Sequence, residues 1–178
     1  MEAGASLYNM HIIFETPRLY LRQFTLADTE LVLRLNSDPA VLQYLHEPML
    51  KDEAHATEIL NTIIFPQYKN NLGRWATFLK DTNEFIGWCG LKYLPEREEI
   101  DLGYRFIPAY WGKGYACEAA KHTVDHGLHH LQLKTISGMA HINNIASLKI
   151  LEKIGMQFIK EDVVDDCPVK TYCITNLK

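Results

Sequence analysis

Short segments in which apolar and polar residues alternate recur along the chain. Residues 18–24 read RLYLRQF, and their period of two is typical of a strand with one buried face. Further β-rich segments are separated by polar turns, among them residues 81–84 and 95–98. The pattern predicts strands over residues 18–24, 74–79, 85–93, 99–106, 134–142, 158–163 and 169–174.

Helical periodicity and capping residues predict the helices. Thr25 and Asp28 form a capping-box pair ahead of an apolar stripe, and Asp38 and Asp52 precede two further helical segments. Pro66 is expected to end the third of these segments. The predicted helices cover residues 26–35, 38–45, 52–65, 115–130 and 144–153, and residues 1–14 are predicted to be a loose tail.

The order of these elements predicts an α+β fold with a central mixed sheet flanked by helices. The first strands follow one another through short turns, so they are expected to pair antiparallel. The strand–helix–strand unit over residues 99–142 requires a parallel pair instead. We therefore expect a mostly antiparallel sheet with one parallel crossover, in a single domain that spans residues 1–178.

Composition and charge narrow the class of protein. The chain has 178 residues, of which 47% are hydrophobic and 22% charged, and this balance argues against disorder. The net charge of −4 disfavours tight binding to a nucleic-acid backbone. No segment approaches the roughly 20 apolar residues of a membrane-spanning helix, and the first residues lack the pattern of a signal peptide. These features predict a cytoplasmic protein that binds neither nucleic acid nor membrane.

The most informative segment, residues 108–116 (PAYWGKGYA), lies between a predicted strand and an amphipathic helix. Gly112 and Gly114 lack the Cβ atoms that would hold a ligand away from the backbone. Unpaired N–H groups there, together with the positive end of the helix dipole, make an anion site. Tyr115 and Cys117 exclude a nucleoside-triphosphate loop and a dinucleotide loop, respectively. The pyrophosphate loop of an acyl-coenzyme A transferase remains, with an unliganded turn as the alternative.

Several segments, in order along the chain, resemble the GNAT superfamily of N-acetyltransferases. The loop matches the family pattern [QR]-x-x-G-x-[GA] at Gly114 and Ala116, whereas Trp111 replaces Gln or Arg. This tryptophan and the string YWGKGYA resemble the branch that contains the ribosomal-protein N-terminal (alanine/serine) acetyltransferases. The other matching segments are residues 15–19 (ETPRL), 101–104 (DLGY), 144–147 (NIAS) and 151–156 (LEKIGM).

The resemblance implies a GNAT-like sheet whose parallel crossover forms the coenzyme A site. It also implies acetyl-coenzyme A as acyl donor, no metal, and direct attack by a primary amine in a ternary complex. The acceptor amine, a protein N-terminus or a small molecule, is not identified by the sequence. Four aromatic residues either line an acceptor groove or belong to the core: Tyr44, Trp75, Trp88 and Tyr93.

Within that resemblance, Asp101 and Ser147 are the catalytic candidates. Asp101 stands where the branch often has Glu and is expected to help remove the amine proton, directly or through water. A strand carboxylate paired with a basic neighbour is its alternative role. Ser147 matches the serine to which the branch assigns protonation of the departing thiolate, with helix-start hydrogen bonding as the alternative. Leu151 replaces the tyrosine that many family members use as the acid.

The resemblance also implies which residues contact coenzyme A. Phe106 and Ile107 are expected to pair with the pantetheine amides as an added strand does. Asn144 is expected either to bond the pantetheine arm or only to cap its helix. The two lysines are expected to meet phosphates or to be ordinary surface lysines. The full set is Phe106, Ile107, Trp111, Gly112, Lys113, Gly114, Tyr115, Ala116, Asn144 and Lys149.

Two other functions stay open from the sequence. A non-catalytic acyl-coenzyme A sensor would keep the loop but not the acid and the base. A metal-binding protein would use the histidines of residues 122–130, but Thr123 stands where a zinc protease needs Glu. We therefore expect no metal and a solvated polar face made of His122, His126, His129 and His130. A homodimer also remains open.

Overall fold

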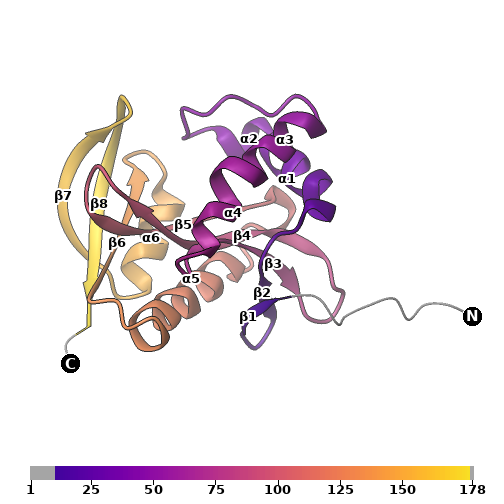
Figure 1. The fold of residues 1–178 in the computed structure, drawn as a ribbon. Helices are drawn as coiled ribbons and strands as arrows, with labels where there is room; N and C mark the ends of the chain where they lie inside the picture. The colour runs from indigo at the N-terminus through magenta and orange to yellow at the C-terminus, as the bar shows by residue number, and fades with distance from the viewer. Residues whose placement is uncertain (1–10, 177–178) are drawn as a thin grey trace, which may run out of the picture.

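The strands and helices follow the order predicted from the sequence (Figure 1). The computed structural model describes residues 11–176. The strands are β1 (Ile12–Glu15), β2 (Leu19–Arg22), β3 (Gly73–Leu79), β4 (Phe85–Leu94), β5 (Glu99–Phe106), β6 (Thr135–His141), β7 (Gln157–Val164) and β8 (Cys167–Thr175). The α-helices are α1 (Thr29–Asn36), α2 (Pro39–Leu42), α3 (Glu53–Ile59), α4 (Phe65–Tyr68), α5 (Tyr115–Asp125) and α6 (Ile145–Lys153). Short 3-10 segments are η2 (Leu26–Asp28) and η4 (Pro108–Tyr110), and π-helical segments are η3 (Leu60–Ile64) and η5 (His126–His130).

One sheet joins these strands in the order β1-β2-β3-β4-β5-β6-β8-β7. Neighbouring strands pair antiparallel except β5 and β6, which run parallel and are connected through α5. The predicted α+β fold, a mostly antiparallel sheet with one parallel crossover, is therefore confirmed. The parallel pair lies near the middle of the sheet, and the segment with the two loop glycines follows β5 directly.

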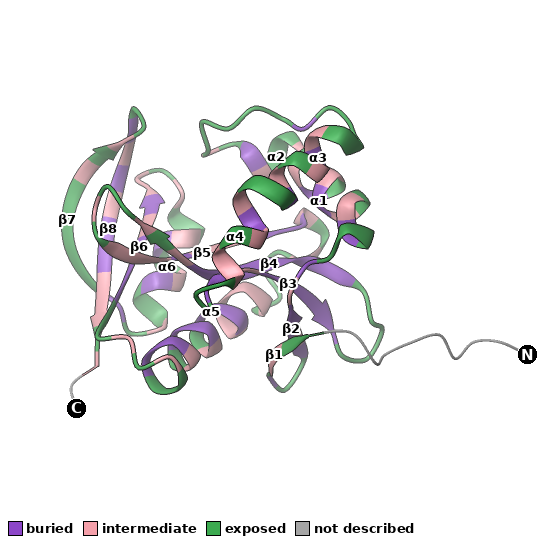
Figure 2. Cartoon of the chain, viewed as in Figure 1, coloured by how far each residue is buried: buried purple, intermediate pink, exposed green. Residues whose placement is uncertain are grey.

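Helices cover both faces of the sheet, so the strands are buried between two apolar layers. Figure 1 shows α1–α4 gathered on one side and α5 on the other. Adjacent residues of β3 point to different layers: Trp75 packs with Ala119 and Ala120 of α5, whereas Ala76 packs with Leu35 of α1. The central strands are mostly buried, and the edge strand β7 is mostly exposed (Figure 2). No helix within residues 11–176 is long and apolar enough to span a membrane.

The predicted loose tail is wrong for residues 12–14, which belong to β1 and pair with β2. β1 also explains why His126 departs from the predicted solvated histidine face, whereas His129 and His130 are exposed as predicted. Phe14 lies over η5, with its ring 5.3 Å from the ring of His126, and Trp75 approaches the same imidazole at 5.6 Å. Because His126 is half-buried among aromatic rings, burial lowers its pKa, with a further contribution from His130. The expectation for residues 1–10 lies outside the described residues.

The boundaries of the first helices also differ from the prediction. Residues 26–28 form the 3-10 segment η2, although the capping box between Thr25 and Asp28 is present as predicted. Pro66 does not end the third helix, because α3 continues through η3 into α4 and Pro66 lies in the first turn of α4. Pro66 cannot donate a backbone hydrogen bond to the preceding turn, and it follows directly after the π segment η3, where the regular α-helical bonding is already interrupted. The wider π turn lets Leu60 and Ile64 stay buried.

Gly90 is expected to tolerate no side chain. A Cβ atom on Gly90 would lie 1.8 Å from the carbonyl oxygen of Gly73 on the neighbouring strand. Because the sheet holds that carbonyl, Gly90→Ala is expected to lower the free energy of unfolding by about 1–3 kcal/mol. Gly127→Ala is the control, since its Cβ would meet only the movable side-chain ends of Ile136 and Leu91. Denaturant unfolding measures both variants, and an equal loss in the two would contradict the assignment.

Candidate functional site

The loop between β5 and α5 has the backbone of an anion site. Gly112 and Gly114 have φ angles of +74° and +83°, in the left-handed region that favours glycine. No atom lies within 4 Å of the position that a Cβ on Gly112 would occupy, so the loop is open on that side. The first backbone bond of α5 runs from the Glu118 N–H to the Gly114 carbonyl. The N–H groups of residues 115–117 therefore have no partner inside the helix and are free for an anion.

Arg18, just before β2, holds this loop against the sheet. Its guanidinium donates to the Lys113 carbonyl at 3.1 Å and pairs with Glu118 at 2.6 Å, while lying 4.4 Å from the centroid of the Tyr115 ring. Glu118 also accepts from the Thr16 hydroxyl at 2.6 Å and from the Arg18 N–H at 2.9 Å. Burial raises the pKa of Glu118, but the hydrogen bonds from Thr16 and Arg18 outweigh burial, and the pKa is lowered.

Sequence reasoning missed this role for Arg18, because its partner lies 100 residues away along the chain. The signal was present in the segment ETPRL, where Thr16 and Arg18 are the two residues that bind Glu118. The position of the loop is therefore set by the connection between β1 and β2 as well as by β5.

β5 and β6 separate as they approach the loop. Their parallel ladder holds the pairs Asp101–Ser137 and Leu102–Gly138, whereas β5 continues to Phe106 and β6 to His141. We call this opening, between residues 103–106 and residues 139–141, the β5–β6 wedge. Within the described residues, the β6-facing backbone of residues 103–106 has no ladder partner. An unpaired strand edge of this kind can pair with an extended ligand.

Phe106 is the strand-end residue whose backbone faces the wedge. The Ile107 N–H donates to the Ile86 carbonyl at 2.9 Å, and the Ile107 carbonyl accepts from Tyr110 at 3.0 Å, so both of its backbone groups are bonded within the protein. Because residues alternate along an antiparallel strand, Phe106 points its N–H away from β4. The Trp111 indole donates to the Phe106 carbonyl at 2.7 Å and thereby connects the loop to the strand end.

Ser147 lies across the wedge from β5 and contacts Tyr104. The two hydroxyl oxygens are 2.8 Å apart, and the Tyr104 hydroxyl is also 3.1 Å from the Ser147 carbonyl. Burial raises the pKa of Tyr104 strongly, so this hydroxyl stays protonated. The Asn144 side chain accepts from the Ser147 N–H at 3.1 Å and caps α6. Tyr104 is the last residue of the DLGY segment, but the sequence did not indicate its contact with Ser147.

Asp101 lies on the opposite face of β5, beside Lys92 on β4 and Ser137 on β6. Its Oδ1 atom is buried and has no hydrogen-bond partner among the described residues. Burial, with a smaller contribution from the Glu99 carboxylate, raises the pKa of Asp101 to about 7. No ion pair to a basic neighbour is present for Asp101 within residues 11–176, which argues against the purely structural role. A carboxylate with this pKa can exchange a proton near neutral pH.

A cavity of about 310 Å³ lies on the Asp101 side of the sheet, under α1, α3 and η3. Trp88 is part of its wall, as the sequence allowed. The other three aromatic candidates are not: Trp75 is in the core on the other face, Tyr44 lies 5.5 Å from the His141 ring, and Tyr93 is exposed. Sequence reasoning did not identify Arg74, Lys92 and Arg105, which supply the charges of this cavity.

The remaining candidates are peripheral. Lys113 and Lys149 are both exposed, and the Lys113 ammonium lies 5.5 Å from the centroid of the Tyr110 ring. Leu151 is fully buried, and the Tyr172 hydroxyl donates to Glu152 at 2.9 Å, so neither takes the place of a tyrosine acid. In the part of the chain that the structure describes, no three His, Cys, Asp or Glu residues are placed to hold a metal ion.

Known proteins are similar to this chain in sequence and in fold. Residues 18–157 match a family model described as an acetyltransferase (GNAT) domain. An uncharacterized N-acetyltransferase, p20, of Bacillus licheniformis is 30% identical over 152 residues, which are 85% of this chain and 84% of that protein. A GNAT-family acetyltransferase structure from Bacillus anthracis has a TM-score of 0.79 at 26% identity and covers 92% of this chain and 98% of its own. A ribosomal L7/L12 alpha-N-protein acetyltransferase, solved with coenzyme A, has a TM-score of 0.80 at 15% identity, with 93% and 98% covered. The chain therefore belongs to the GNAT family of acetyltransferases.

Proposed function

We propose that this protein transfers the acetyl group of acetyl-coenzyme A to a primary amine by direct attack. The observation that carries the proposal is the junction of the loop with the β5–β6 wedge. The free N–H groups at the start of α5 lie at the end of the strand whose β6-facing backbone is unpaired. An anion site joined to an open strand edge suits a ligand with a pyrophosphate at one end and an amide-containing arm.

The residues present fit that donor. The loop backbone from Gly112 to Ala116 and the dipole of α5 would hold the pyrophosphate, and the side of Gly112 is free of protein atoms. Phe106 and Tyr104 would offer backbone groups to the pantetheine amides, as an added strand does. Asn144, which already caps α6, and Lys113 and Lys149 are within the set that we assign to donor binding. When bound, the donor supplies a thioester carbon that an amine can attack.

The acid and the base lie on different sides of β5. Asp101 is on the cavity side, where an acceptor amine would arrive, and its partnerless oxygen would accept the amine proton directly or through water. Ser147 is on the α6 side, where its hydroxyl would donate to the departing sulfur while Tyr104 orients it. This separation matches the two proton transfers that amine acylation needs. A sensor without catalysis would have no need of a carboxylate whose buried oxygen has no hydrogen-bond partner among the described residues.

Gly114→Val is expected to raise the dissociation constant for acetyl-coenzyme A at least tenfold, which is about 1.4 kcal/mol. A Cβ on Gly114 would be strained at φ +83° and would meet the Arg18 guanidinium at 3.4 Å. Ala109→Val, an exposed position in the same connection, is the matched control and should bind normally. Isothermal titration measures both; wild-type affinity in a folded Gly114→Val protein would remove the loop assignment.

Asp101→Asn is expected to lower kcat at pH 7.5 by about 10²–10⁴-fold, the usual range for acid–base help. Only the ionised carboxylate accepts a proton, and its pKa is about 7, so activity of the unmodified protein should fall as the pH drops below 7. The activity of the variant should not show this fall near pH 7. It should rise only as the amine itself deprotonates, at about pH 8–10. Steady-state rates from pH 6 to 10 measure this. Glu96→Gln, an exposed carboxylate in the β4–β5 turn, is the control.

Ser147→Ala is expected to lower kcat by roughly 10–100-fold with little change in donor affinity, because a thiolate is a tolerable leaving group without an acid. Tyr104→Phe should act through Ser147, so the double variant should be no slower than Ser147→Ala alone. Ser37→Ala, at an exposed serine, is the control. Additive losses in the double variant would contradict the positioning role of Tyr104, and full turnover in all variants would contradict the acid assignment.

A further inference from the structure

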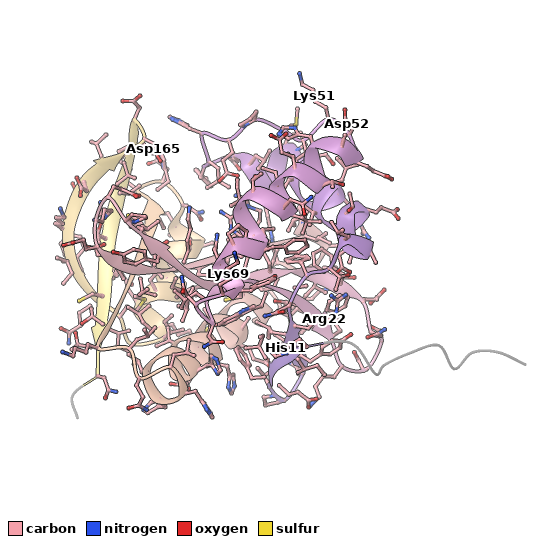
Figure 3. The ribbon with its side chains drawn as sticks, viewed as in Figure 1. His11, Arg22, Lys51, Asp52, Lys69 and Asp165 are labelled. Atoms are coloured by element: carbon pink, nitrogen blue, oxygen red, sulfur yellow. The ribbon has the colours of Figure 1, made fainter. Side chains whose placement is uncertain are left out.

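The cavity on the Asp101 side of the sheet has an apolar part and a charged part. Its apolar wall comes from the segment after β2, from α1, from the loop before α3, and from α3 and η3 (Phe24, Val32, Leu35, Leu50, Ile59 and Ile64). The loop that forms its rim runs from α2 to the start of α3, where Lys51 and Asp52 mark its end in Figure 3. The same loop reaches the tip of the β7–β8 hairpin, where His46 contacts the carbonyl of Asp165 at 3.2 Å.

The charged part of the cavity holds more positive than negative side chains. Arg105 is neutralised, because Glu47 accepts from its guanidinium at 2.9 Å and Asn36 accepts from another of its nitrogens. That pair leaves Arg74 and Lys92 as cations of the cavity wall without a carboxylate partner of their own within residues 11–176. The cavity therefore carries a surplus of positive charge on the face where the acceptor would lie.

Of the two cations, Arg74 has the surroundings that better indicate a ligand-binding role. Its guanidinium lies over the Trp88 indole, 4.9 Å from the ring centroid, and has no hydrogen bond or ion pair among the described residues. Arg105 approaches the same indole at 5.7 Å, so two guanidinium groups flank one ring. Burial lowers the pKa of Arg74, and the charge of Arg105 lowers it further, whereas the carboxylates of Glu47 and Asp101 raise it. Arg74 is half-buried, and contact with an indole offsets only part of the cost of desolvating a cation that has no ion-pair partner in the described part of the chain.

The register of the sheet places this cation close to the base. Arg74 on β3 is opposite Gly90 on β4, which is opposite Gly103 on β5. Gly103 leaves room for the Trp88 ring, which a Cβ would approach at 3.1 Å. Asp101 is two residues from Gly103 on the same face, a step of roughly 7 Å along a strand. The cavity wall itself reaches Lys92, which is the cross-strand partner of Asp101 on β5.

We propose that the acceptor is an amine that also carries a carboxylate and an apolar side chain, as a free amino acid does, and that Arg74 binds the carboxylate. This inference rests on the proposed acetyl transfer and deepens it by naming the acceptor class. The planar guanidinium suits bidentate binding of a carboxylate, and Lys92 adds a second positive charge. The apolar wall takes the side chain, and the amine then lies toward Asp101. A polyamine would bring further positive charge against Arg74 and is disfavoured.

The test compares acceptors that differ only in the carboxylate. The full-length protein is assayed with acetyl-coenzyme A and with L-leucine, L-leucinamide, L-phenylalanine, L-phenylalaninamide or spermidine, at equal concentrations of neutral amine. Each amino acid is expected to exceed its amide in kcat/KM by at least tenfold. Arg74→Gln should reduce that ratio at least tenfold. Arg34→Gln is the matched control, because Arg34 is exposed on the same helix α1 that supplies part of the cavity wall, and it should keep the ratio.

Separate outcomes address this inference and the transfer reaction. Equal use of acids and amides, a preference for spermidine, or an unchanged ratio in Arg74→Gln would overturn the acceptor class while leaving acetyl transfer intact. If no amine is acetylated, the proposed transfer fails, and calorimetric binding of L-leucine in the presence of coenzyme A still decides the role of Arg74. Binding that Arg74→Gln weakens at least tenfold would support the role, and binding that it leaves unchanged would overturn it.

Discussion

The separation of β5 from β6 is the constraint on which the site depends. A parallel ladder of two residue pairs holds the strands together at Asp101 and Leu102, and beyond these residues the backbone of β5 has one bonded edge and one open edge. Elsewhere in the sheet such an edge would be paired, since an unpaired row of backbone groups invites association. Here the helices on both faces keep the strands in place without the ladder. The opening is therefore built into the sheet, and it leads from the loop to the two candidate catalytic residues.

Two contacts hold the opening in shape. The Trp111 indole bonds the carbonyl at the end of β5, which connects the loop to the strand that it follows. The Tyr104 and Ser147 hydroxyls meet across the wedge, so α6 is positioned relative to β5 although it follows β6 in the chain. Since the Tyr104 hydroxyl stays protonated, this contact orients Ser147 without adding a charge. The same residues thus serve the packing of the wedge and its proposed chemistry.

Charge is distributed unevenly between the two ends of the site. At the loop, Arg18 pairs with Glu118 and donates to the Lys113 carbonyl, and the proposed anion site is made of backbone N–H groups and the dipole of α5. In the cavity, Arg105 is neutralised by Glu47, whereas Arg74 keeps an unpaired guanidinium against Trp88. A paired arginine supports structure, and an unpaired one is available to a ligand. Because Arg74 has no ion-pair partner within residues 11–176 and Arg105 has one, the cavity is expected to favour an acceptor with a carboxylate over a polyamine.

The sequence alone determined the order of the elements, the parallel crossover and the loop, because these depend on local patterns: alternation within a strand, helical period, and glycines where φ is positive. Its resemblance to the family also made Asp101 and Ser147 the catalytic candidates. The tertiary structure decided what depends on residues far apart in the chain. β1 covers the helical face that carries His126, and Pro66 is accommodated within a continuing helix. Arg18 contacts Glu118, and Tyr104 contacts Ser147. Whether an arginine is paired is likewise invisible in the sequence, because it depends on which carboxylate the fold brings within reach, and that alone separates Arg74 from Arg105.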